Sequence, residues 1–70
     1  MEIIATSDTE IKDRKQVLSE IKEKVLAYKE FFGELPQLGT EVMTEEVDIF
    51  VLVNITVVDN DLHFNFEGME

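Results

Sequence analysis

The stretch that decides the fold is EVDIFVLVNITVVDNDLHFNFE, residues 46–67. From Glu46 onward the apolar side chains recur with a period of two, and many of them are β-branched, which is typical of a strand. Asp59-Asn60-Asp61 is a turn signal, because Asn and Asp tolerate left-handed backbone dihedral angles and bond their own backbone. The stretch therefore predicts a β-hairpin made of strands 46–58 and 62–67.

The pattern also predicts which side chains share a face of this hairpin. A two-residue loop at Asn60-Asp61 would pair Val57 with Phe64 and Ile55 with Phe66, whereas a shift by one residue would mix the faces. The alternation assigns one face to Val47, Ile49, Val51, Val53, Ile55 and Val57, and the other to Phe50, Leu52 and Val58. Part of the first strand is therefore expected to be covered on both sides.

An amphipathic helix is predicted upstream, over residues 8–32. Its apolar positions recur at spacings of three and four, with Arg14 in the one polar position of the series Ile11, Leu18, Ile21, Val25, Tyr28 and Phe32. Ser7-Asp8-Thr9-Glu10 has the form of a capping box at the start of the helix. Gly33 is the expected left-handed stop, Pro36 prevents continuation, and residues 34–44 are expected to be a loop.

These elements predict a single α+β domain, residues 1–70, with one helix packed on a small antiparallel sheet in the order β-α-β-β. Strand 46–58 is about twice as long as 62–67, so residues 2–6 are expected to pair with it, within the chain or from a second protomer. Seventy residues without cysteine build a small core and no disulfide, so a homodimer is expected. Its candidate contacts are Val17, Leu26, Phe31 and Phe50.

The charge distribution is one-sided. All six basic residues lie between Lys12 and Lys29, whereas residues 30–70 carry ten carboxylates and no Lys or Arg, and the net charge is −10. A field of one sign attracts the opposite charge, so a basic protein partner is expected, and direct binding of nucleic acid or of an anionic membrane is disfavoured.

The longest apolar run, residues 49–53, is far shorter than the roughly 20 residues that span a membrane. With no secretory signal at the acidic start, a cytosolic location is expected.

Catalytic and metal chemistry find little support in the sequence. The chain has one His, two Ser and no Cys, and His63 lies on a predicted strand, so a nucleophile, a base and an orienting group are not expected to converge. Asp59-x-Asp61 begins like a calcium loop, but Phe64 stands where the sharp turn requires glycine. We expect no enzyme, no metal site and no cofactor.

The acidic residues are the remaining candidates for a functional site. Solubility alone would be served by mixed signs. On a strand from Glu46, the side chains of Glu46 and Asp48 would point the same way about 6.8 Å apart, which is close to the separation of neighbouring phosphates in DNA. Carboxylates held in this way can occupy the places where Lys and Arg of a partner neutralise phosphate. The predicted phosphate surrogates are Glu41, Glu45, Glu46, Asp48, Asp59, Asp61 and Glu67.

The small size, the absent cysteine, the one-sided acidity and the helix-plus-hairpin pattern resemble the small DNA-mimic proteins of bacteriophages. Proteins of that group block uracil-DNA glycosylases, restriction enzymes or the histone-like nucleoid protein of the host. The resemblance implies a non-enzymatic inhibitor in the bacterial cytoplasm, and the nucleoid protein suits it because that protein reads DNA backbone and shape. The alternative is a structural or regulatory interaction module that binds through its helix and a strand edge.

Overall fold

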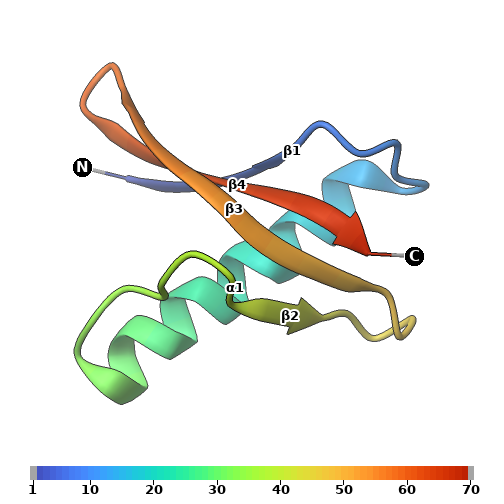
Figure 1. The fold of residues 1–70 in the computed structure, drawn as a ribbon, viewed down its shortest axis with the longest axis horizontal. Coiled ribbons are helices and arrows are strands. Elements are labelled where there is room, and N and C mark those ends of the chain that lie inside the picture. The colour runs from blue at the N-terminus through green and yellow to red at the C-terminus, as the bar shows by residue number, and fades with distance from the viewer. Residues whose placement is uncertain (1, 70) are drawn as a thin grey trace.

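A computed structural model of the chain describes residues 2–69 as one helix and four strands (Figure 1). The elements are β1 (Ile3–Ser7), α1 (Arg14–Phe32), β2 (Glu41–Met43), β3 (Ile49–Val58) and β4 (Asp61–Met69). They form one sheet in the order β1-β4-β3-β2, in which β1 runs parallel to β4 and the other neighbours are antiparallel. The predicted α+β class is confirmed. The sheet is mixed rather than antiparallel, and its element order is β-α-β-β-β rather than β-α-β-β.

The additional strand, β2, lies inside the predicted loop 34–44. It pairs with the first part of β3, where Glu41 lies opposite Val51 and Met43 opposite Ile49. Residues 2–6 were expected to pair with the first strand of the hairpin, which is β3. Instead, β1 pairs with β4 of the same chain. Three residues are too few to show a period of two, and Pro36 and Gly39 favour the interpretation as a loop.

The hairpin between β3 and β4 turns one residue earlier than predicted. Asp59 and Asn60 occupy its two central positions with φ angles of 49° and 69°, and a two-residue hairpin loop with both φ angles positive is a type I′ turn. The turn places Val57 opposite Leu62 and Ile55 opposite Phe64, so the partner of each β3 residue from Asn54 to Val58 differs by two from the prediction. A difference of two keeps every side chain near the turn on its predicted face.

A β-bulge at Val53 changes the faces farther from the turn. The register shifts between Leu52, opposite Phe66, and Asn54, opposite Asn65, so Val53 is an extra residue on β3. An extra residue reverses the alternation on one side of the bulge. Phe50 and Leu52 consequently share the helix-facing side with Ile55 and Val57, whereas Ile49 and Val51 face away from the helix. The prediction of one apolar face from Val47 to Val57 is wrong for this reason.

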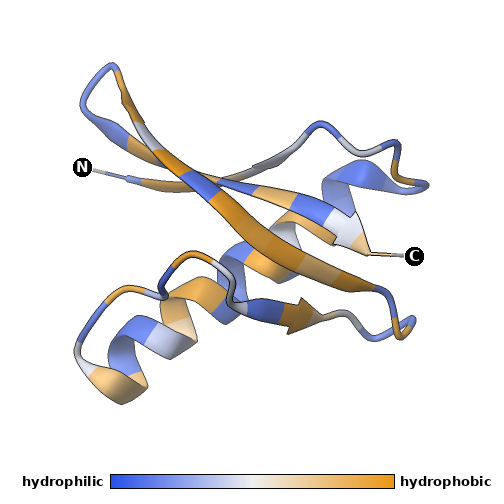
Figure 2. Cartoon of the chain, viewed as in Figure 1, coloured by the Kyte–Doolittle hydropathy of each residue, from blue (hydrophilic) through white to orange (hydrophobic). Residues whose placement is uncertain are grey.

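The core lies between α1 and one face of the sheet. Figure 2 shows hydrophobic residues along much of β3 and on α1 where the helix crosses the sheet. The buried cluster combines three helix residues at a spacing of four with residues of three strands: Val17, Ile21 and Val25 with Ile3, Ala5, Phe50, Leu52, Phe64 and Phe66. The opposite face of the sheet is not covered by any helix in the described residues, and we call it the open face (Figure 1).

The helix begins at Arg14, six residues later than predicted. Asp13 precedes it in a left-handed conformation without a side-chain capping hydrogen bond, so the predicted capping box is wrong. Ser7 Oγ instead accepts a hydrogen bond from the Thr9 N–H (3.1 Å), and the Arg14 guanidinium donates to the carbonyl oxygens of Ser7 and Thr9. The predicted stop is confirmed, because Gly33 has φ 73° and its N–H donates to the Lys29 carbonyl at 2.8 Å. Within residues 2–69, no helix has the length and apolar character needed to cross a membrane.

Val47, in the turn between β2 and β3, is strained. Its φ angle is 64° although its side chain is β-branched and 71% exposed, and its N–H donates to the Thr44 carbonyl (2.9 Å). A β-branched residue in the left-handed backbone conformation destabilises the folded state by roughly 1–2 kcal/mol. We expect Val47→Gly to raise the free energy of unfolding by about 1 kcal/mol, measured as a higher urea midpoint at an unchanged slope.

The control for this substitution is Val58→Gly. Val58 is also exposed, but it lies in β3 and is not among the residues with positive φ. Glycine there relieves no strain and should lower the free energy of unfolding by roughly 0.5–1 kcal/mol. Equal effects of the two substitutions would contradict the assignment of strain to Val47.

Candidate functional site

Three segments that are distant in the sequence meet at one end of the molecule. They are the β1–α1 connection (residues 8–13), the β2–β3 turn (residues 44–48) and the last residues of β4, which lie together on the right in Figure 1. The three segments border an open concavity of about 600 Å³. Its lining residues are Thr9, Glu10, Ile11, Lys12, Glu46, Asp48, Ile49, Phe50, Glu67, Gly68 and Met69.

Carboxylates dominate the charge of this concavity. Glu10, Glu46, Asp48 and Glu67 line it, and among its described lining residues Lys12 is the one basic side chain. A smaller hollow of about 70 Å³ shares Glu46 and adds further carboxylates. We call the combined surface the acidic end, and its members are Glu10, Asp13, Glu20, Glu45, Glu46, Asp48 and Glu67.

Hydrogen bonds fix the backbone that carries these carboxylates. The Glu45 N–H donates to Glu20 Oε2 of α1 at 2.8 Å, which ties the β2–β3 turn to the helix. The Gly68 N–H donates to Thr9 Oγ1 at 2.9 Å, which ties β4 to the β1–α1 connection. A Cβ atom at Gly68 would lie only 3.0 Å from Thr9 Cγ2, so glycine allows this close approach. Hydrogen bonds therefore hold the segments of the acidic end together.

The basic residues lie mainly on the other layer of the molecule. α1 carries Arg14, Lys15, Lys22, Lys24 and Lys29, whereas β2, β3, β4 and their turns carry no Lys or Arg. The Arg14 guanidinium, at the start of the helix, donates to backbone carbonyls. Both of these hydrogen bonds hold Arg14 against the chain that precedes the helix. The helix layer and the sheet layer differ in the sign of their charge.

Four of the seven predicted phosphate surrogates converge at the acidic end: Glu45, Glu46, Asp48 and Glu67. Their arrangement differs from the prediction, because β3 begins at Ile49 and places Glu46 and Asp48 in a turn. The regular strand spacing of about 6.8 Å expected for these two residues is therefore not present.

The other three predicted surrogates lie elsewhere. Glu41 is on the open face, in the same cross-strand row as Val51 and Glu67. Asp59 and Asp61 belong to the β3–β4 turn at the opposite end of the hairpin, where Asp61 Oδ1 accepts a hydrogen bond from the Glu2 N–H at 3.0 Å. The seven residues thus occupy both ends of the sheet and do not form one continuous ridge.

Glu10, Asp13 and Glu20 are members of the acidic end that the sequence did not indicate. Asp13 and Glu20 lie in the segment that contains the basic residues, Glu10 lies just before it, and Glu10 and Asp13 were expected inside the helix. The available signal was Arg14, the polar residue that interrupts the apolar series after Ile11. The helix begins there, and the preceding residues fold against the β2–β3 turn and the end of β4.

The open face also presents an apolar row beside the acidic end. Met43, Ile49 and Met69 lie opposite one another on β2, β3 and β4, and Glu41 and Glu67 flank Val51 in the next row on this face.

His63 lies farther along the sheet, between Ile4 and Thr56. Within residues 2–69, no three His, Asp or Glu side chains are grouped closely enough to hold a metal ion.

The four candidate dimer contacts separate into two pairs. Val17 and Phe50 are 8% and 4% exposed and belong to the core between α1 and the sheet. Leu26 and Phe31 are 42% and 83% exposed on α1. Of these four candidate contacts, Leu26 and Phe31 are the two whose side chains a second molecule can reach.

No protein-family model matches the chain, and no curated protein and no solved structure matches it either.

The bond between Thr9 and Gly68 can be tested directly. We expect Thr9→Val, which keeps the side-chain shape and removes the acceptor, to lower the free energy of unfolding by about 1 kcal/mol. The amide of Gly68 should also exchange faster with deuterium, as measured by NMR. Thr9→Ser keeps the hydroxyl group and should preserve the protection of this amide. Unchanged exchange at Gly68 in Thr9→Val would rule out a structural role for the bond.

Proposed function

We propose that this protein is a non-enzymatic inhibitor that occupies the basic DNA-binding groove of another protein and excludes DNA from it. The best single candidate for the target is the bacterial histone-like nucleoid protein, which would place the inhibitor in the bacterial cytoplasm. The observation that carries the proposal is the convergence of seven carboxylates from four segments around two adjoining hollows, with Lys12 the one basic residue among the described lining residues.

The electrostatics of the acidic end supply the driving force. Carboxylates that lie close together on a fixed backbone repel one another and gather counterions, as DNA phosphates do. A partner that brings Lys and Arg side chains to this surface releases those counterions, which favours association. The same field repels nucleic acid, so the expected partner is the DNA-binding protein and not the DNA.

The arrangement mimics charge more than it mimics shape. The carboxylates surround a concavity, and they do not follow the regular spacing of a phosphate chain. A target that reads DNA through backbone charge and deformability tolerates such a surrogate better than a target that reads base edges. The apolar row Met43, Ile49 and Met69, beside the carboxylates, offers contact to the aliphatic parts of Lys and Arg side chains.

The proposal is tested by competition with DNA. The protein should displace a fluorescently labelled duplex from purified histone-like nucleoid protein, measured by anisotropy. Its own affinity for that protein, measured without DNA, should fall roughly tenfold or more between about 50 and 200 mM salt, because counterion release weakens as salt rises. An affinity that stays flat over this range would contradict charge-driven association.

Charge-neutral variants locate the binding surface. We expect Glu46→Gln, Asp48→Asn and Glu67→Gln together to weaken binding to the nucleoid protein by tenfold or more. The matched control is Glu23→Gln, Glu30→Gln and Glu34→Gln, which changes the net charge equally at exposed positions outside the acidic end. The control should weaken binding by only a few-fold. Equal losses would show that net charge alone matters and that the acidic end is not the site.

A second candidate function, an interaction module acting through the helix, is favoured by the exposure of Phe31. Its ring centroid lies 4.9 Å from that of Phe32, which lies 4.5 Å from Tyr28, so the end of α1 presents an aromatic group to solvent. Exposed aromatic side chains are enriched at protein interfaces. A homodimer joined by α1 through Phe31 and Leu26 would use this surface.

The homodimer is tested by sedimentation equilibrium. If α1 joins two copies, Phe31→Ser should raise the dimer dissociation constant by tenfold or more, because it removes the exposed ring from the interface. Leu38→Ser, at an exposed apolar position in the connection between α1 and β2, is the control and should leave the dissociation constant unchanged. A monomeric wild-type protein at all concentrations would exclude the homodimer.

A further inference from the structure

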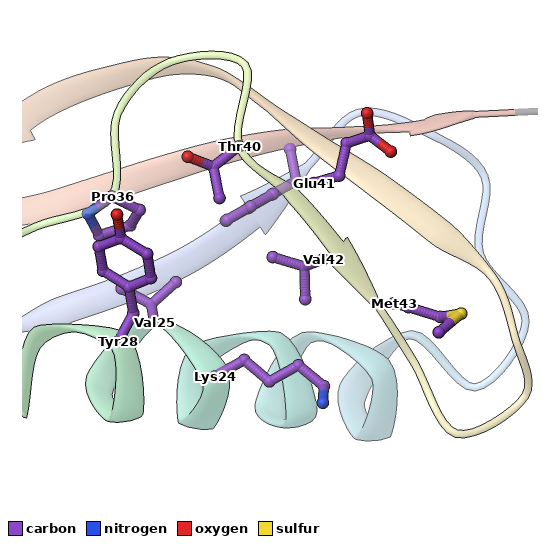
Figure 3. Close-up of a pocket in the computed structure, with 9 residues that line it drawn as sticks. Lys24, Val25, Tyr28, Pro36, Thr40, Glu41, Val42 and Met43 are labelled. Carbon is purple, nitrogen blue, oxygen red and sulfur yellow. The ribbon is translucent and has the colours of Figure 1, made fainter. Parts of the chain in front are cut away.

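A second concave surface lies between α1 and β2, away from the acidic end. It measures about 320 Å³ and is lined by Lys24, Val25, Tyr28, Pro36, Thr40, Glu41, Val42, Met43 and Phe66 (Figure 3). Val25 and Phe66 are buried residues of the core, so the floor of this groove is apolar. Its two walls are a helix and the outermost strand of the sheet.

The free edge of β2 presents unpaired main-chain groups to this groove. The Leu52 N–H donates to the Thr40 carbonyl and the Thr44 N–H donates to the Asp48 carbonyl, both at 2.9 Å, so these two residues of the segment face β3. Because hydrogen-bonded and non-hydrogen-bonded pairs alternate in an antiparallel ladder, Val42 also faces β3. The N–H and C=O groups of Glu41 and Met43 therefore point to the outer edge, where the sheet order places no further strand of the described residues.

The side chains around the groove have a definite polarity. Figure 3 shows Val42 pointing toward α1, the Lys24 side chain extending along the helix beneath β2, and the Tyr28 ring beside Pro36. The carboxylate of Glu41 points away from the helix in the same view. Among the described lining residues, Lys24 is the one basic and Glu41 the one acidic side chain. Because the Glu41 carboxylate points away from the helix, the charged group beside the helix wall is the Lys24 ammonium, and an acidic side chain complements it there.

We propose that this groove binds an extended peptide segment of a partner protein as an additional strand beside β2. The main chain of the peptide would pair with the N–H and C=O groups of Glu41 and Met43. One apolar side chain would contact Val25, Val42 and Phe66, and an acidic side chain next to it would reach the Lys24 ammonium. Addition of a strand to a sheet edge combines main-chain affinity with side-chain specificity in this way.

The dimensions favour a peptide over a small molecule. Pockets that hold drug-sized ligands enclose roughly 300–1,000 Å³, and this groove is at the lower limit and open along its length. A small ligand would leave the four edge groups of β2 without partners, whereas a strand satisfies them. A short edge strand also protects against indiscriminate pairing, so the groove decides which peptide binds. The inference is independent of the acidic end and of the proposed inhibition.

The experiment uses a phage-displayed library of random heptapeptides against the full chain. Selected peptides should alternate apolar, β-branched residues with polar ones and carry Asp or Glu at one fixed position. A synthetic peptide with the selected sequence should then slow deuterium exchange at the amides of Glu41 and Met43, which are unpaired in the free protein. A library that yields no binder, or a binder that leaves both amides unprotected, overturns the proposal.

Two substitutions test the two halves of the interaction. Met43→Pro removes an outward-facing N–H that β3 does not use, a place where an edge strand tolerates proline, and should weaken the selected peptide by tenfold or more. Met43→Leu keeps the N–H and should bind normally. Lys24→Gln should abolish the preference for the acidic residue, whereas Lys22→Gln, outside the groove, should retain it. If Met43→Pro fails to fold, the Lys24 pair and the wild-type amide exchange decide the outcome.

Discussion

The shared burial of Phe64 and Phe66 of β4 with Ile21 and Val25 of α1 is the interaction on which the rest of the molecule depends. β4 is flanked on both sides, by β1 and by β3, so its inward side chains lie at the centre of the sheet. Full burial of each large apolar side chain contributes roughly 1.5–3 kcal/mol. In a chain of 70 residues such contributions are few, and the carboxylates of residues 2–69 lie outside the buried core, where they do not compete with it.

Periodic patterns of apolar side chains predicted the helix and the hairpin. Features that depend on one or a few residues, such as the bulge at Val53 and the strand β2, were missed. The helix and hairpin are periodic, and the stop at Gly33 follows from one well-characterised motif. The bulge at Val53 leaves no sign in the pattern, because a β-branched residue suits either face of a strand. The strand β2 is held by its pairing with β3 and by the covering of Val42, which are long-range effects that a pattern of three residues cannot express.

The same distinction explains the outcome at the acidic end. Glu46, Asp48 and Glu67, which the charge distribution singled out, line one concavity, whereas the seven predicted residues do not share one surface. The partners of these residues from the β1–α1 connection were hidden, because in the sequence Glu10 and Asp13 alternate with basic residues. Folding occupies Arg14, which bonds to the carbonyls of Ser7 and Thr9, and leaves Asp13 beside the β2–β3 turn, while Lys12 stays at the concavity with Glu10. Proximity in the fold, and not in the chain, decides the local field.

The separation of charge between the layers has a consequence for the partners of the molecule. The acidic end is lined by seven carboxylates, whereas the groove between α1 and β2 is mainly apolar and has Lys24 as the one basic side chain among its described lining residues, so the two surfaces suit partners of different chemistry. If both proposals hold, a basic protein would be attracted to the acidic end and repelled by Lys24, whereas a peptide with an acidic residue would be repelled by the turn that carries Glu46 and Asp48. Because β2 forms one wall of the groove and leads directly into that turn, a strand added at Met43 would also restrict the backbone that presents those carboxylates. The two surfaces are thus distinct in chemistry and joined through one short strand.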